Sequence, residues 1–226
     1  EEVVDIIKDE PEVLEGFDEK YKNRFKFLED YQNIKYAEKF GDLVSYARKI
    51  DKNIGNGSQF STAVLKNYFK LMAYKDEYEV SRLMTNKKFV DDVNKNFEGN
   101  FNYNFYLAPP IFSKKSKVDG KLLKVKFGGW LFNVFKLLSK FKFLRGTKLD
   151  PFGYLDERKK ERELIRDYKQ TITDIGTKIN KSNYETAVKI ASIPDQIRGF
   201  GHVKEKNIKE AINYRTDLLN SFHENT

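Results

Sequence analysis

The residues of this 226-residue chain that could do chemistry are few, and their spacing matches no catalytic pattern. There is no cysteine, which excludes thiolate nucleophiles, disulfides and thiolate ligands for zinc or iron–sulfur clusters. The two histidines, His202 and His223, lie far apart along the chain and have no acidic residues in a metal-site pattern beside them. Neither a phosphate-binding glycine loop nor a G-x-S-x-G motif occurs. We therefore predict no catalytic, cofactor-binding or metal-binding residue.

One glycine-rich loop offers candidate docking residues. It has the sequence Arg198-Gly199-Phe200-Gly201-His202-Val203-Lys204, and its glycines permit backbone angles that other residues resist. Arg198, His202 and Lys204 are therefore candidates for contact with a ligand or a neighbouring domain. The structural alternative carries more weight, namely that His202 caps the following helix or binds a buried carbonyl.

A second candidate is the turn over residues 145–154, which contains two cations, an acid and two aromatic side chains. Arg145, Asp150 and Tyr154 are its candidate docking residues. Here too the structural interpretation is favoured, because Gly146 can end a helix and Asp150-Pro151 can start a turn.

The positive charge of the chain is concentrated in one segment. Residues 114–148 carry eleven Lys or Arg and a single acid, Asp119, whereas the whole chain has a net charge of +8. Such a segment could bind single-stranded nucleic acid, lie on an anionic membrane, or surround a core helix and face an acidic protein. We favour the last, because the apolar residues of 129–143 cover about half of a helix. The candidate docking cations are Lys114, Lys115, Lys117 and Lys121, and no nucleic acid is expected as a partner.

The hydrophobic pattern predicts a mainly α chain, formally α+β, with a small β-hairpin or short antiparallel sheet around 101–128. After a lead-in over 1–17, we expect one domain over 18–226. Apolar residues recur at helical spacing and alternate in two strands. The helical stretches are 18–47, 61–84, 129–143, 155–179 and 203–222, and the strands are 101–107 and 123–127. Thr85 and a capping box at 182–185 are predicted to begin two further helices.

Targeting signals are not visible in the sequence. No run of about 18 apolar residues predicts a membrane span, and the acidic start lacks the basic region of a signal peptide. We therefore expect a cytoplasmic protein. The first residue is Glu1, as expected of a processed chain, of a chain from which a tag was removed, or of a piece of a longer polypeptide.

Several distinctive short sequences follow one another along the chain. They are Phe69–Val80, Leu107–Pro110, Phe127–Trp130, Phe143–Thr147, Asp150–Tyr154 and Gln196–Glu205. With these sequences in this order, the chain resembles, over about residues 25–220, the C-terminal region of indolepyruvate ferredoxin oxidoreductases. These enzymes belong to the 2-oxoacid:ferredoxin oxidoreductase family, and the region that the chain resembles follows their gamma-type domain.

The resemblance implies a place in a larger enzyme. Such enzymes use thiamine diphosphate, magnesium and iron–sulfur clusters to convert an aryl 2-oxoacid to an acyl-CoA, and they pass the electrons to ferredoxin. These cofactors would lie elsewhere in the polypeptide, because this chain has no cysteine and Asp119-Gly120 lacks the preceding glycine of a thiamine diphosphate motif.

We therefore expect a non-catalytic accessory domain that supports domain packing, oligomerisation or docking. Its expected partners are other domains or subunits of the oxidoreductase, and ferredoxin. The alternative is a free-standing module that binds nucleic acid or a membrane surface.

Overall fold

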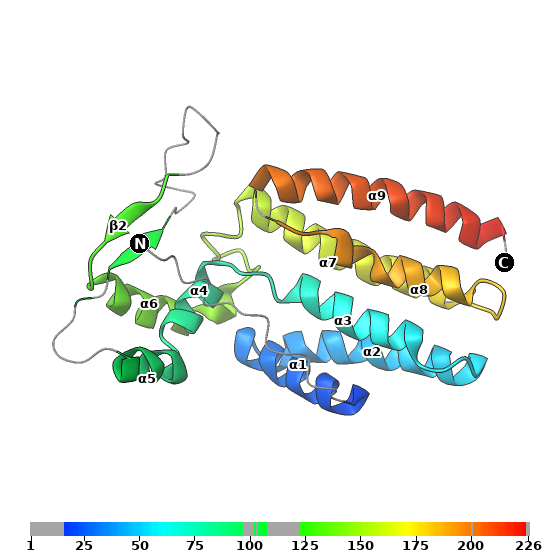
Figure 1. Ribbon diagram of the computed structural model, residues 1–226, viewed down its shortest axis with the longest axis horizontal. Helices are drawn as coiled ribbons and strands as arrows, with labels where there is room; N and C mark the ends of the chain where they lie inside the picture. The colour runs from blue at the N-terminus through cyan, green and yellow to red at the C-terminus, as the bar shows by residue number, and fades with distance from the viewer. Residues whose placement is uncertain (1–15, 97–101, 103, 108–122, 200, 225–226) are drawn as a thin grey trace. The chain divides into compact units, whose positions relative to one another are not determined.

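The computed structural model describes residues 16–96, 102, 104–107, 123–199 and 201–224. The described residues form helices and one two-stranded antiparallel sheet, which confirms the predicted mainly α chain with a small hairpin (Figure 1). They fall into two compact units. Unit 1 contains the residues up to Ala73 and those from Glu161 onward, and unit 2 contains Tyr74–Lys160. The expected domain over 18–226 thus comprises two such units, and most of the expected lead-in lies outside the described residues.

Unit 1 is a layered array of helices. Neighbours in this array are α1 with α2, α2 with α3, α3 with α8, and α8 with α9 (Figure 1). The helices are α1 (Phe17–Tyr31), α2 (Ile34–Ile54), α3 (Gln59–Met72), α7 (Asp156–Gly176, whose first turn belongs to unit 2), α8 (Tyr184–Ser192) and α9 (Gly201–Glu224). A 3₁₀ turn, Ile193–Gln196, follows α8 directly and contains Pro194 in its first turn.

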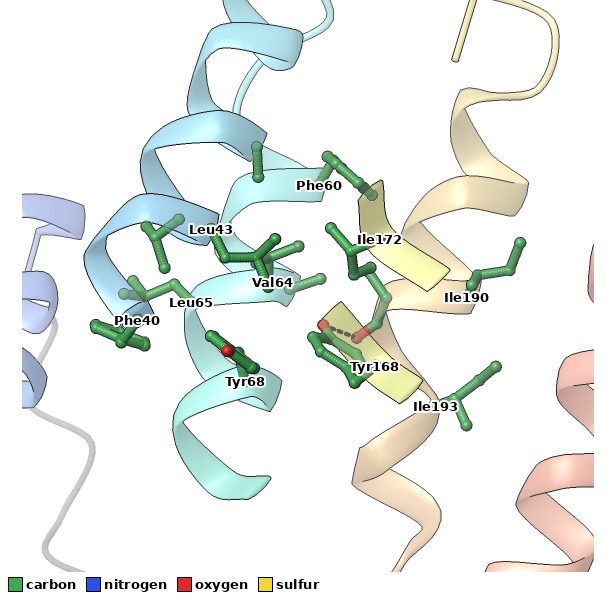
Figure 2. Packing of buried hydrophobic residues seen from close by; sticks show 14 of the residues in the cluster. Phe40, Leu43, Phe60, Val64, Leu65, Tyr68, Tyr168, Ile172, Ile190 and Ile193 are labelled. Carbon is green, nitrogen blue, oxygen red and sulfur yellow. Dashed lines mark hydrogen bonds between the residues drawn. The ribbon is translucent and has the colours of Figure 1, made fainter. Parts of the chain in front are cut away.

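The core of unit 1 lies between these helices and is rich in aromatic side chains (Figure 2). The rings of Tyr68 and Tyr168 stack with centroids 5.8 Å apart, and the Tyr168 hydroxyl donates to the Ala191 carbonyl at 2.8 Å. Burial raises the pKa of Tyr68 to about 12 and also raises that of Tyr168. Both hydroxyls therefore stay protonated across the physiological range.

Unit 2 has a smaller apolar core. Its elements are α4 (Glu77–Met84), α5 (Lys87–Asn96), β1 (Phe105–Leu107), β2 (Val125–Phe127), α6 (Leu131–Lys140) and a 3₁₀ turn, Lys142–Leu144. The strands pair antiparallel with Phe105 opposite Phe127. Helix α6 packs against α4, and Phe135 of α6 meets the ring of Phe105 edge-on at 5.2 Å.

Two predicted helices are in fact interrupted. The helix expected over 61–84 is wrong, since α3 ends at Met72 and α4 begins after Asp76, whose carboxylate accepts from the Glu79 N–H at 2.8 Å. The pattern over 18–47 breaks at Asn33, whose side chain caps α2. In both places a capping side chain starts a new helix within a continuous apolar pattern.

Two predicted caps are also wrong. The Thr85 hydroxyl donates back to the Ser81 carbonyl, while the Asn86 side chain accepts from the Lys88 N–H. Before α8, the side chain of Asn183 accepts from the Asn180 N–H, which tightens the loop ahead of the helix and leaves no capping box.

Candidate docking surface

The turn containing Arg145 is held by a buried ion pair. Arg145 is only 4% exposed, and its Nη2 donates to Asp76 Oδ1 at 2.8 Å while its Nε donates to Asp76 Oδ2. Asp76 is itself buried and caps α4. The guanidinium also lies over the ring of Tyr78, 5.6 Å from its centroid. One carboxylate thus fixes both the start of α4 and the position of Arg145.

Asp150 forms the second half of this cluster. Its Oδ2 accepts from the Gly146 N–H at 2.8 Å, and its Oδ1 accepts from the Phe152 N–H and from the Tyr78 hydroxyl, each at 3.1 Å. Gly153 packs so closely that a Cβ there would lie 2.7 Å from Asp150 Oδ2. Burial, the Asp150 carboxylate and the hydrogen bond to it raise the pKa of Tyr78 well above 10, so its hydroxyl remains a donor.

These contacts show what Arg145 and Asp150 do. Both side chains are buried and bind groups of unit 2, and Tyr78 bridges them. The turn over 145–153 is therefore fastened to α4 by charge-assisted hydrogen bonds. Tyr154 differs, because the residue is 62% exposed while its hydroxyl donates to the Lys148 carbonyl at 2.8 Å.

A further ion pair lies at the start of α4. Arg158 Nε lies 3.3 Å from Glu77 Oε2, and its guanidinium lies over the ring of Tyr74. Burial raises the pKa of Glu77, although Arg158 acts in the opposite direction. Unit 2 is therefore stabilised by these two buried or partly buried ion pairs in addition to its apolar contacts.

The loop over 198–204 belongs to unit 1. Arg198 Nε donates to the Asp195 carbonyl at 2.9 Å, and Lys204 Nζ binds Glu161 Oε1 at 2.7 Å. Gly199 has a φ of 88°, which favours glycine at this position. The side chain of His202 and the residues Lys114, Lys115, Lys117 and Lys121 lie outside the described residues.

Cations surround the 3₁₀ turn before this loop. Lys66 Nζ lies 3.0 Å from Asp195 Oδ2, and Lys70 Nζ donates to the Pro194 carbonyl at 2.7 Å. Burial lowers the pKa of Lys70, and the nearby Arg198, Lys66 and Lys204 lower it further, although Asp195 opposes them. Lys66, Lys70 and Arg198 each bind a carbonyl or carboxylate oxygen of Pro194 or Asp195, and these contacts stabilise the turn.

Helix α6 buries only part of its apolar surface. Leu131 and Phe135 are buried, one turn apart, on the side that meets the rest of unit 2. The expectation that the whole apolar arc of 129–143 is core is therefore wrong. Four large apolar side chains of this arc are exposed, and we call them the apolar stripe: Trp130, Val134, Leu137 and Phe141.

Exposed apolar residues are concentrated in unit 2. Of the fourteen large apolar side chains that are exposed among the described residues, ten belong to unit 2, although it is the smaller unit. They are Tyr106, Leu123, Val125, Trp130, Val134, Leu137, Phe141, Phe143, Leu149 and Tyr154. Single exposed apolar residues are normal, but a contiguous group of them marks an interaction surface.

Sequence reasoning missed both the ion-pair cluster and the stripe. Asp76 with Glu79 three residues later is a local capping pattern that predicts the start of α4. The partners Asp76 and Arg145 are 69 residues apart, so no local signal joins them. The exposure of the stripe depends on which elements cover α6, and periodicity does not contain that information.

Within the described ranges, no group of three or more His, Cys, Asp or Glu side chains could hold a metal ion. In the same part of the chain, every helix is too short or too polar to cross a lipid bilayer.

The described residues define a mainly helical protein with internal ion pairs and, in unit 2, exposed apolar side chains on and around α6. Residues 17–216 match the model of a family of unknown function, DUF6537, and the chain belongs to that family. Neither a curated protein nor a solved structure matches the chain.

Proposed function

We propose that the chain is a non-catalytic accessory domain of a cytoplasmic indolepyruvate ferredoxin oxidoreductase, which we call the parent enzyme. In that enzyme the domain supports packing or oligomerisation, or docks a partner such as ferredoxin. Thiamine diphosphate, magnesium and iron–sulfur clusters would be bound by other parts of the polypeptide. The aryl 2-oxoacid would be oxidised there, with its electrons passing to ferredoxin.

The observation that supports this proposal is the structural role of the residues that carry the resemblance. Three of the sequences that carry the resemblance contribute to one cluster in unit 2. The first supplies Asp76 and Tyr78, the second Arg145 and the third Asp150, and these side chains contact one another. Their charged and polar atoms hold the turn against α4 in a buried cluster. In unit 2 these residues stabilise the fold, as expected of a domain that contributes no catalytic residue.

The basic segment supports the docking part of the proposal. Its described half, residues 123–149, carries seven Lys or Arg and no acid. An acidic protein surface would be attracted to such a segment, and the attraction would weaken as salt screens it. Ferredoxin-dependent turnover of the parent enzyme, measured against salt with Lys114, Lys115, Lys117 and Lys121 changed to Gln, tests this part. Salt dependence identical to that of the wild type would contradict it.

The proposal as a whole is tested by the reading frame and by the isolated chain. We expect the frame to encode a gamma-type domain upstream of Glu1. The purified chain should show no absorbance from a prosthetic group and no turnover of aryl 2-oxoacids with coenzyme A and an electron-accepting dye. A start codon immediately before Glu1, or cofactor-dependent turnover by the isolated chain, would refute the proposal.

A further inference from the structure

The apolar stripe has a regular geometry. Its residues are spaced by four, three and four positions, which at 3.6 residues per turn places them within an arc of about 60° along roughly 16 Å of helix. The buried pair Leu131 and Phe135 lies about a third of a turn away around α6. Apolar residues at this four-three spacing form the face by which a helix packs into an apolar groove or against another helix.

Aromatic contacts extend the stripe at both ends. The ring of Phe127, at the end of β2, meets Trp130 nearly edge-on at 6.2 Å, and Phe143 lies 6.1 Å from Phe141. The stripe and Phe143 have side chains that are 39–60% exposed. With about 150–250 Å² for each aromatic side chain, the exposed apolar area is on the order of 500 Å². That is near the upper end for a monomer surface and over half of one side of a standard protein interface.

The cations beside the stripe indicate the chemistry of a partner. Lys136 and Lys140 lie one turn apart on one flank of α6, and two more exposed lysines lie just before and within β2, Lys124 and Lys126. No acid occurs in 123–149 to neutralise them. A second copy paired across the stripe would bring like charges together, so self-association is disfavoured. A partner with carboxylates around an apolar centre would complement both features.

We infer that the apolar stripe, with Lys136 and Lys140 beside it, binds an acidic protein surface with an apolar groove on the catalytic part of the parent enzyme. This inference rests on the proposed function, which supplies the partner. The stripe fills the groove and excludes water. The lysines attract the carboxylates around the groove and so orient the two surfaces as they approach.

The test measures binding of the purified chain to the catalytic part of the same oxidoreductase, produced without these 226 residues. Calorimetric titration should show a defined complex whose affinity falls with salt. Trp130→Ser and Leu137→Ser should each weaken it at least about tenfold. The double change Lys136→Gln with Lys140→Gln should weaken it and reduce its salt dependence. Because these side chains are exposed, the circular dichroism and unfolding midpoint of the variants should match those of the wild type.

Matched controls lie in unit 1. Tyr214→Ser removes an exposed aromatic from α9, and Lys169→Gln with Lys209→Gln removes two exposed cations. Both variants should bind as the wild type does. Binding that the stripe variants leave unchanged would overturn the inference and leave the proposed function standing. No binding by the wild-type chain would overturn the inference together with the packing part of the proposed function.

Two further arms test other occupants of the same surface. The chain is mixed with vesicles of phosphatidylcholine and phosphatidylglycerol in a roughly 2:1 ratio, and sedimentation detects bound protein. Analytical ultracentrifugation of the chain alone detects self-association. Vesicle binding or dimerisation that Leu137→Ser abolishes would overturn the inference, and the absence of both supports it.

Discussion

Replacing Arg145 by methionine removes one partner of the buried ion pair and retains most of the side-chain volume. Asp76 would keep its bond to the Glu79 N–H but would lose both guanidinium bonds while remaining 3% exposed. A buried carboxylate left without its cation costs about 3–5 kcal/mol of folding free energy. We therefore expect Arg145→Met to destabilise unit 2 by that amount.

The assay is urea unfolding followed by two signals. Trp130 is the single tryptophan and reports on unit 2, whereas far-ultraviolet circular dichroism reports on the helices of both units. In Arg145→Met the fluorescence transition should move to lower urea and precede much of the loss of helix. The double variant Asp76→Asn with Arg145→Met should lose less, about 1–3 kcal/mol, because asparagine still caps α4 and carries no charge.

A surface arginine provides the control. Arg166 in α7 is 73% exposed and lies 3.6 Å from Glu163, so Arg166→Met should change stability by less than about 1 kcal/mol. If Arg145→Met unfolds as the wild type does, or if the double variant is less stable than Arg145→Met, the ion pair does not fasten the turn to α4.

Three other changes test the packing. Gly153→Ala places a Cβ against Asp150 Oδ2 and should lower the stability of unit 2 by about 1–3 kcal/mol, measured by Trp130 fluorescence in urea. Tyr184→Phe removes the hydroxyl that donates to Asp51 Oδ1 at 2.6 Å and should cost about 1–3 kcal/mol by circular dichroism, whereas an unchanged midpoint would contradict this. The folded-state pKa of Tyr68, about 12, exceeds its ordinary value of 10. Its contribution of about 2–3 kcal/mol is therefore complete below pH 10 and should fall between pH 10 and 12, with phenolate absorbance appearing together with unfolding.

The general fold could be predicted from the sequence because its signals are local. The alternation of Phe105 and Leu107 with their neighbours predicted the first strand, and the helical spacing of apolar residues over 64–72 indicated a helix where α3 lies, although not its end. The helix boundaries were less predictable, because Asp76 and Asn33 stop one helix and start the next through single side-chain bonds. Such caps end one helix and begin the next while the spacing of apolar residues in the sequence continues unchanged.

The candidate site was less predictable, because its contacts join distant residues. Arg145 and Asp150 were recognised as special from the turn sequence, but their partners Asp76 and Tyr78 lie about 70 positions away. Likewise, the periodicity of α6 shows that one side is apolar, while the exposure of Leu137 depends on the elements that surround the helix. A local pattern specifies an amphipathic helix but not its neighbours.

Ferredoxin-dependent turnover of the parent enzyme, measured with and without these 226 residues, tests most directly whether the chain is an accessory domain. We expect the shortened enzyme to keep its cofactors and lose turnover, and the separately purified chain to restore that turnover when added back. Full ferredoxin-dependent turnover by the shortened enzyme would contradict the proposed role.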